Sequence, residues 1–82
     1  PNIENLSISS IARMIRRNWS KVYFGAVPYL DAMNSLETIN DNYIADSGRE
    51  IVMYFLSNAT TWKGDVARVV KAELKRRLKN AN

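Results

Sequence analysis

The longest unbroken apolar stretch of the chain covers residues 51–56, Ile-Val-Met-Tyr-Phe-Leu, and it follows a clear signal for the start of a helix. Ser47 and Glu50 are spaced as a capping box, in which each side chain accepts a hydrogen bond from a backbone N–H of the first turn. Asp46 adds negative charge where the helix dipole favours it. Because a helix that is apolar on every side belongs in the middle of a fold, we expect residues 48–59 to form the central and most buried helix, with Ser47 and Glu50 as its structural cap.

The composition of this stretch is also typical of a buried strand, and the same holds for Val22-Tyr23-Phe24. Periodicity cannot separate helix from strand over six residues, so the flanking signals decide. Two isolated strands would lack the partners that a stable sheet needs. The cap and the helical patterns on both sides therefore favour a helix.

Two longer stretches show a single apolar face at helical spacing. The first runs from about Asn5 to Trp19, and its apolar positions continue in register beyond its end to Val22: Ile8, Ile11, Ala12, Ile15, Trp19 and Val22. The second begins at a cap on Thr60 or Thr61 and reaches about Leu78, and its inward positions are expected to be Trp62, Val66, Val69, Val70, Leu74 and Leu78. Glu73 and Arg77 fall inside this second apolar arc, four residues apart. Either they pair at the edge of the core, or the last turns of the helix contact another chain.

A break separates the first helix from a short second one. Gly25 frees the backbone there, and Pro28 suits the first turn of a helix whose apolar positions are Tyr29, Ala32, Met33 and Leu36. The aromatic residues around this break indicate a buried hinge between packed helices, with a binding groove as the alternative.

Residues 38–46 form a polar connector before the central helix. Neither register that starts at Asn40 or Asp41 fits the ligand pattern of a calcium loop. The predicted fold is therefore all-α, a compact bundle of about four helices in a single small domain over residues 1–82.

The sequence has 82 residues, no cysteine and no apolar run long enough to cross a bilayer. We therefore expect no disulfide, no membrane span and a cytoplasmic location. Small domains without disulfides often gain stability by self-association. We expect an oligomer, most simply a dimer, that forms through the apolar surface of the second and last helices.

Histidine is absent as well as cysteine, which removes the usual general base and the usual ligands of transition metals. The three glycines, Gly25, Gly48 and Gly64, are too far apart to form a phosphate-binding loop. We expect a protein that is not an enzyme and that uses no metal and no cofactor.

The net charge of +4 is unevenly distributed along the chain. Residues 26–60 carry −4, whereas residues 1–25 carry +3 and residues 61–82 carry +5. Basic side chains recur along one side of the last helix, and with those of the first helix they are the candidate surface for an anionic partner: Arg68, Lys71, Lys75, Lys79, Arg76, Arg13 and Arg17. A solvated helix face is the simpler interpretation of the same charges.

Three binding functions remain open, and the least favoured is docking of the last helix on a membrane surface, because its apolar face of Val, Ala and Leu with a single Trp is poorer than typical interfacial anchors. The favoured one is binding of a protein partner, either a host factor or a second copy, through aromatic and basic surface. The alternative is a nucleic-acid-binding module that uses the basic C-terminal helix. Residues 48–79 loosely resemble a helix-turn-helix, but Asp65 would then face phosphates. The acidic residues of the middle segment would also repel a phosphate backbone, which favours the protein partner.

Three segments carry a resemblance to known proteins: residues 22–30, Asp46-Ser47-Gly48, and residues 54–59 with Trp62-Lys63-Gly64. They resemble small uncharacterised all-helical proteins of bacteriophages and mobile elements. The resemblance covers most of the chain and implies a short accessory or host-interacting protein in the cytoplasm of a bacterial host cell, with no catalytic residues.

Overall fold

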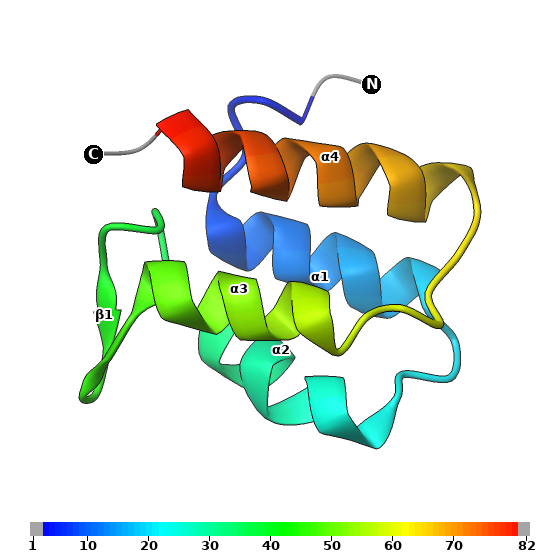
Figure 1. Ribbon diagram of the computed structural model, residues 1–82, viewed down its shortest axis with the longest axis horizontal. Coiled ribbons are helices and arrows are strands. Elements are labelled where there is room, and N and C mark those ends of the chain that lie inside the picture. Colours follow the sequence, from blue (N-terminus) through cyan, green and yellow to red (C-terminus); the bar gives the residue numbers. More distant parts are fainter. Residues whose placement is uncertain (1–2, 81–82) are drawn as a thin grey trace.

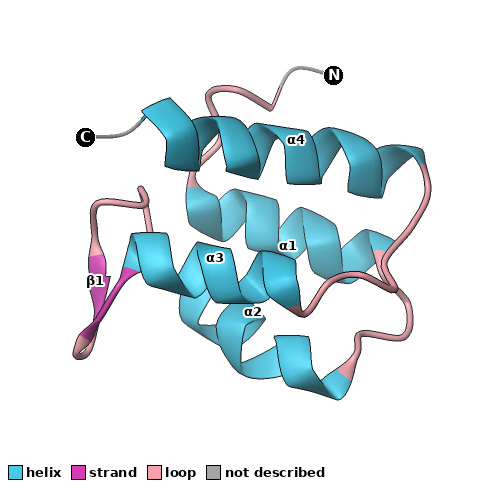
Figure 2. Cartoon of the chain, in the orientation of Figure 1, coloured by secondary structure: helices cyan, strands magenta, loops and turns pink. Residues whose placement is uncertain are grey.

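The computed structural model describes residues 3–80, and within that range it has four α-helices, one 3-10 helix and one two-stranded hairpin (Figures 1 and 2). In chain order these are α1 (Ile8–Asn18), η1 (Phe24–Ala26), α2 (Val27–Met33), β1 (Asn42–Tyr43), β2 (Asp46–Ser47), α3 (Gly48–Ser57) and α4 (Asp65–Asn80). The helical prediction is confirmed, but a purely all-α fold is wrong because residues 42–47 pair as strands. Figure 1 shows α1, α3 and α4 side by side, with α2 below them and α1 at the back.

Helix α1 contributes one apolar face to the core. Ile8, Ile11, Ala12 and Ile15 are fully buried, as their spacing predicts. The helix begins three residues later than expected because Ser7 is its cap: the Ser7 hydroxyl accepts a hydrogen bond from Ser10 N at 3.1 Å. The N–H groups of Ile8 and Ser9 donate to the backbone carbonyls of residues 37 and 36, which ties the start of α1 to the segment after α2.

Helix α3 is less buried than its composition suggests. Ile51, Val52 and Phe55 are in the core, but Met53 and Tyr54 are about half exposed. The expectation of a helix that is covered on every side is therefore wrong, although residues 48–59 still contribute five buried residues, Gly48, Ile51, Val52, Phe55 and Ala59. A chain of this size has too few helices to surround one of them, and α3 packs on α2 and α4 while its remaining side faces solvent (Figure 1).

Helix α4 turns a different face to the core than its apolar pattern predicts. Ala67, Val70 and Leu74 are buried, but Val66 and Val69 are exposed. The buried arc also includes the carboxylate residue Glu73. Ion pairs with Arg76 and Arg77 allow a carboxylate to occupy this position.

An aromatic cluster closes the end of the core where α1, α3 and the loop before α4 meet. The rings of Trp19 and Trp62 stack at 5.7 Å, and Phe55 meets both edge-on at 6.3 and 6.5 Å. The indole of Trp62 also donates a hydrogen bond to Asn18. The inward orientation expected for Trp62 is thus confirmed.

The break between α1 and α2 is only partly buried. Tyr23 and Phe24 are exposed, Phe24 to 79 %, so the expectation of a buried aromatic hinge is wrong for these two residues. Gly25 is needed for close packing rather than for an unusual backbone conformation. A Cβ atom there would lie 2.6 Å from the Tyr23 ring and 2.8 Å from Asn58 Oδ1. The segment therefore packs directly against the end of α3.

The connector before α3 contains a hairpin in which Asn42 pairs with Ser47 and Tyr43 with Asp46. Asp41 organises its base: the carboxylate accepts hydrogen bonds from the N–H groups of Glu37 and Thr38, and the carbonyl accepts one from Gly48 at 2.7 Å. A Cβ atom at Gly48 would lie 2.9 Å from two backbone oxygens of this connector. These contacts fix the hairpin against the first turn of α3.

Candidate functional site

The basic side chains of α4 are largely engaged within the protein itself. Arg68 pairs with Asp65 at 2.9 Å on the surface. The ammonium group of Lys71 donates to the Trp62 carbonyl at 2.7 Å and lies 5.9 Å from the centre of the indole ring. Burial, together with the positive charges of Lys63 and Lys75, lowers the pKa of Lys71.

The Glu73 carboxylate forms ion pairs with two more of the basic side chains of α4. Arg76 contacts its carboxylate through Nε and Nη2 at 2.9 and 2.7 Å, and Arg77 Nε does so at 2.6 Å. Arg77 also donates to the carbonyls of Ile3 and Glu4, at 2.9 and 3.0 Å. The hydrogen bonds from Arg76, reinforced by Arg77, lower the pKa of Glu73 to about 2. Of the two interpretations of Glu73 and Arg77, the structure shows the pair at the edge of the core.

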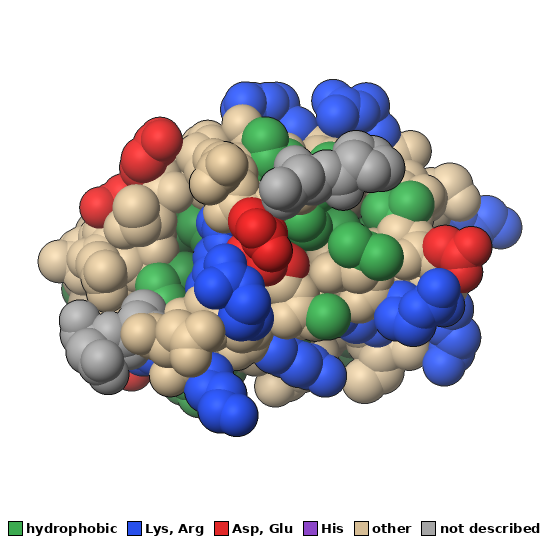
Figure 3. Space-filling view, turned by 90° about the horizontal axis from the view of Figure 1, so that it is seen from above, with side chains coloured by type: hydrophobic (Ala, Val, Ile, Leu, Met, Phe, Trp, Pro, Cys, Tyr) green, Lys and Arg blue, Asp and Glu red, His purple; other side chains and the backbone are tan. Residues whose placement is uncertain are grey.

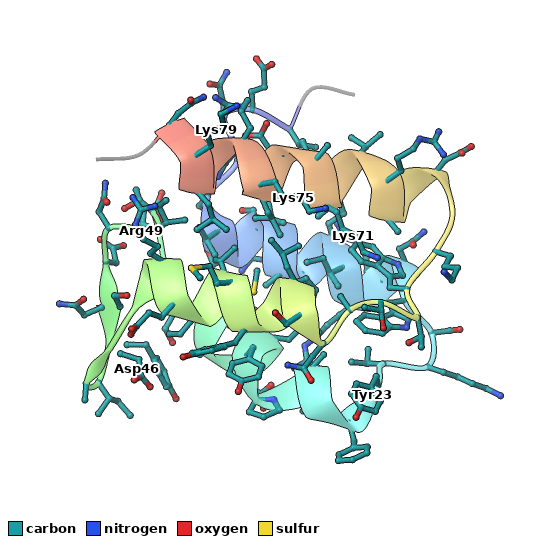
Figure 4. All side chains as sticks on the ribbon, in the orientation of Figure 1. Tyr23, Asp46, Arg49, Lys71, Lys75 and Lys79 are labelled. Atoms are coloured by element: carbon teal, nitrogen blue, oxygen red, sulfur yellow. The ribbon has the colours of Figure 1, made fainter. Side chains whose placement is uncertain are left out.

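Lys75 and Lys79 are the exposed cations that remain on α4, and Figure 4 shows both on the helix with Lys71. Within residues 3–80, no carboxylate pairs with either of them. The free basic surface of α4 is therefore two lysines rather than a stripe of four or five cations.

Arg13 and Arg17 lie on the outer side of α1, away from its buried face, and Arg13 donates to the Ser10 hydroxyl at 3.2 Å. An apolar depression of about 290 Å³ lies between α1 and α4, and its lining includes Met14, Val66 and Val69. Figure 3 shows Lys and Arg in several groups on the upper side of the molecule, at its edges and near its middle beside acidic atoms, with apolar atoms between the groups. The basic residues predicted from the sequence thus form separate groups.

A cavity of about 410 Å³ lies where residues 4–7, residues 37–40 and the end of α4 meet. Its cationic side chains are Arg76 and Arg77, both held by Glu73. The first N–H groups of α1 are also bonded, two to backbone carbonyls and one to the Ser7 hydroxyl. The two arginines of this cavity and the first N–H groups of α1 are therefore already engaged within the protein.

A surface of a different kind covers the side of the molecule formed by η1, α2, α3 and the hairpin. We call it the aromatic face and define it by six partly or fully exposed residues: Tyr23, Phe24, Tyr29, Tyr43, Ile44 and Tyr54. The rings of Tyr23 and Phe24 lie 4.8 Å apart, and those of Tyr29 and Tyr54 lie 5.7 Å apart. Figure 4 labels Tyr23 and Asp46 at the two ends of this side.

The hairpin end of the aromatic face holds a small cavity, which we call the tyrosine pocket. It measures about 260 Å³ and is lined by Pro28, Tyr29, Ala32, Tyr43, Asp46, Ile51 and Tyr54. Asp46 is its one charged residue, and no Lys or Arg lines it. Within the described part of the chain, no cation pairs with the Asp46 carboxylate.

Ile44 stands next to this pocket in the sequence and is the most unusual residue of the structure. It is the first of the two turn residues of the hairpin, its φ is 56°, and it is 87 % exposed. In a two-residue hairpin turn, Gly, Asn or Asp normally takes such a left-handed position. A β-branched side chain there is strained, and its exposure means that no packing within the described chain offsets the strain.

Ser47 has the structural position that the sequence predicts for a cap, and the structure shows one of the two hydrogen bonds of the capping box that it forms with Glu50. Ser47 is the N-cap of α3, and its hydroxyl accepts a hydrogen bond from Glu50 N at 3.2 Å. No group of three or more Asp or Glu side chains in residues 3–80 is placed to hold a metal ion. None of the helices in this range is long and apolar enough to cross a membrane.

Sequence reasoning missed the tyrosine pocket because its residues come from four elements, α2, β1, β2 and α3. The Ile-Ala pair at the turn lacks the Asn-Gly or Asp-Gly signal of a hairpin, so nothing in the sequence brings Tyr43 back beside Asp46 at the start of α3. The chain matches no protein-family model, and no significant match was found among curated proteins or solved structures.

Proposed function

We propose that this chain is a non-enzymatic protein-binding module whose aromatic face binds a basic segment of a partner protein. The observation that carries the proposal is Ile44: a large apolar side chain, 87 % exposed, in a left-handed backbone conformation that strains it. Strain of this kind lowers stability and persists where the residue serves another purpose. Contact with a partner protein that buries the Ile44 side chain would be such a purpose.

The rest of the aromatic face supports the same role. Phe24 is 79 % exposed and Tyr54 is 51 % exposed. Exposed aromatic residues gathered on one side of a small protein are typical of protein interfaces. Tyr side chains in particular combine large apolar area with a polar end that tolerates water in the free protein.

The charge of this side indicates a basic partner. Five of the eight acidic residues of the chain fall between residues 31 and 50. Asp31 pairs with Arg16, and Asp41 bonds within the connector. Within residues 3–80, the carboxylates of Asp46 and Glu50 have no cationic partner. Complementary charge steers a basic segment toward this face and repels nucleic acid from it.

The same proposal extends the resemblance to accessory proteins of bacteriophages: a short chain of this kind would act by occupying a host protein. Self-association is the other form of protein binding expected from the sequence. Sedimentation equilibrium at micromolar concentration checks it, and a mass that stays monomeric across the concentration range would remove the second copy as the partner.

The experiment is capture from a lysate of the source organism on the immobilised chain, with and without nuclease. Two variants are compared: Phe24→Ser with Tyr54→Ser on the aromatic face, and Lys75→Glu with Lys79→Glu on α4. We expect a basic protein to be retained after nuclease treatment, and to be lost only with the aromatic-face variant. Retention that disappears with nuclease and with the α4 variant would instead support the nucleic-acid-binding alternative.

A further inference from the structure

We infer that the tyrosine pocket is a subsite for one basic side chain, the ammonium or guanidinium group of a Lys or Arg on the partner. The inference rests on the proposed function, because it assigns a chemical partner to one part of the aromatic face. The pocket joins Tyr29 of α2, Tyr43 and Asp46 of the hairpin, and Tyr54 of α3.

The shape of the pocket suits the end of a single side chain. Its volume of about 260 Å³ is below the range of roughly 300–1,000 Å³ that is typical for sites of small-molecule ligands. Ala32 and Ile51 are buried residues of the core and supply an apolar surface within it. The methylene groups of a Lys or Arg side chain can pack against such a surface while the charged end meets the rings.

The aromatic walls favour a cation. The rings of Tyr29 and Tyr54 are 5.7 Å apart and tilted by 37° to one another, and Tyr43 contributes a third ring to the lining. The face of an aromatic ring attracts a positive charge placed within about 6 Å of its centre, and several rings around one cation form the usual recognition site for alkylammonium groups.

The Asp46 carboxylate determines that the bound group carries a positive charge. Its carboxylate lines the same pocket, where an anionic occupant would be repelled and an apolar one would cover the carboxylate without compensating it. In the part of the chain that the structure describes, no Lys or Arg reaches the pocket or pairs with Asp46. The positive charge that the pocket selects therefore comes from another molecule.

The test is a titration of the full chain, followed by the backbone amide signals of Tyr43, Ile51 and Tyr54 in two-dimensional NMR. The probes are N-acetyl-arginine amide, N-acetyl-lysine amide, choline, and the neutral analogue of choline, 3,3-dimethylbutan-1-ol. We expect saturable shifts with the cations and none with the neutral analogue. Equal shifts with choline and its neutral analogue, or no saturation with any cation, would overturn the inference.

Substitutions in and outside the pocket test which residues bind the cation. Asp46→Asn keeps the shape of an exposed side chain and removes its charge, so we expect cation binding to weaken about fivefold, the equivalent of about 1 kcal/mol. Glu37→Gln, an exposed carboxylate that does not line the pocket, is the matched control and should bind as the parent does. Tyr54→Leu should weaken binding, while Tyr23→Leu, outside the pocket, should not. An Asp46→Asn variant that binds cations as well as the parent would contradict the assignment.

Capture of the partner separates this inference from the proposed function. If the partner basic side chain occupies the pocket, Asp46→Asn weakens capture from the lysate and Glu37→Gln does not. Capture that depends on Phe24 and Tyr54 but is unaffected by Asp46→Asn leaves the protein-binding function in place and overturns the subsite. Cation binding without any protein capture would assign the pocket to a free small cation and would overturn the partner side chain as its occupant.

Discussion

The indole Nε1 of Trp62 donates a 2.8 Å hydrogen bond to Asn18 Oδ1, across 44 positions of the sequence. Trp62 is almost fully buried and stacks on Trp19, so the bond fixes the loop before α4 against the end of α1. Asn18→Ala leaves this donor without its protein partner, which should lower the free energy of unfolding by about 1–2 kcal/mol. Urea denaturation at pH 7 measures the difference.

Asn34 offers a matched control for that variant. It is exposed at the end of α2, and its side chain makes no hydrogen bond within residues 3–80. Asn34→Ala should change the free energy of unfolding by less than about 0.5 kcal/mol. Equal effects of the two substitutions would mean that the Trp62–Asn18 bond does not stabilise the fold.

Lys71 and Lys75 lie four residues apart on α4 but should respond differently to substitution. Lys71 bonds to the Trp62 carbonyl and lies over the indole ring, whereas Lys75 is exposed. Lys71→Ala should cost about 1 kcal/mol of unfolding free energy, and Lys75→Ala less than about 0.5 kcal/mol. Paired thermal melts of the two variants check this, and a neutral Lys71→Ala would show that its ammonium group is solvated.

Ser47 should contribute the usual stability of an N-cap. Its hydroxyl accepts the Glu50 N–H at the start of α3, so Ser47→Ala should lower the free energy of unfolding by about 1 kcal/mol. Ser57 is the control: it bonds back to the Met53 carbonyl within the same helix, where Ala is the better helix former. Ser57→Ala should cause no loss, and a melt unchanged by Ser47→Ala would rule out the cap as a source of stability.

The Glu73 cluster predicts acid sensitivity. Hydrogen bonds from Arg76, with Arg77, lower the pKa of Glu73 from its ordinary value of 4.5 to about 2 in the folded protein. The unfolded chain therefore binds a proton at higher pH than the folded one, and stability that is complete above about pH 4.5 is lost as the pH falls toward about 2. Measurement of the free energy of unfolding at a series of pH values from 7 to 2 checks this loss of stability.

Glu73→Gln should be less stable at pH 7 by about 2 kcal/mol, because the two arginines lose a 7 %-exposed counterion. It should also show a shallower decline between pH 4.5 and 2, the interval over which Glu73 is protonated. Asp41, whose pKa is lowered by hydrogen bonds from Thr38 and Glu37, keeps some acid dependence in both proteins. Identical pH profiles for parent and Glu73→Gln would contradict the role of the cluster.

Most of the fold follows from residue patterns within single helices. The apolar spacing of α1 specifies its buried face, and the Ser47–Glu50 spacing marks the start of α3. Patterns within one helix do not specify how many neighbours cover it. For that reason Met53, Tyr54, Val66 and Val69 are exposed although their composition suggests burial.

Prediction of the basic surface from the sequence is limited for the same reason. A helical wheel places cations on one side of α4, but it cannot show that Lys71 bonds to a carbonyl nine residues earlier or that Arg77 bonds to Ile3 and Glu4. The tyrosine pocket was beyond prediction for a related reason: it requires the hairpin, and the turn at Ile44 has none of the residues that normally form one.

The most direct measurement of the protein-binding role concerns Ile44 alone, because stability and binding should move in opposite directions there. Asn tolerates the left-handed conformation at φ 56°, so Ile44→Asn should raise the free energy of unfolding by about 1 kcal/mol. The same variant should capture less partner protein, since it removes an apolar side chain from the aromatic face, while Ile44→Val should change both quantities little. A variant that is more stable and binds less is the result that we predict. Unchanged capture by a stabilised Ile44→Asn would contradict the role of the aromatic face in binding.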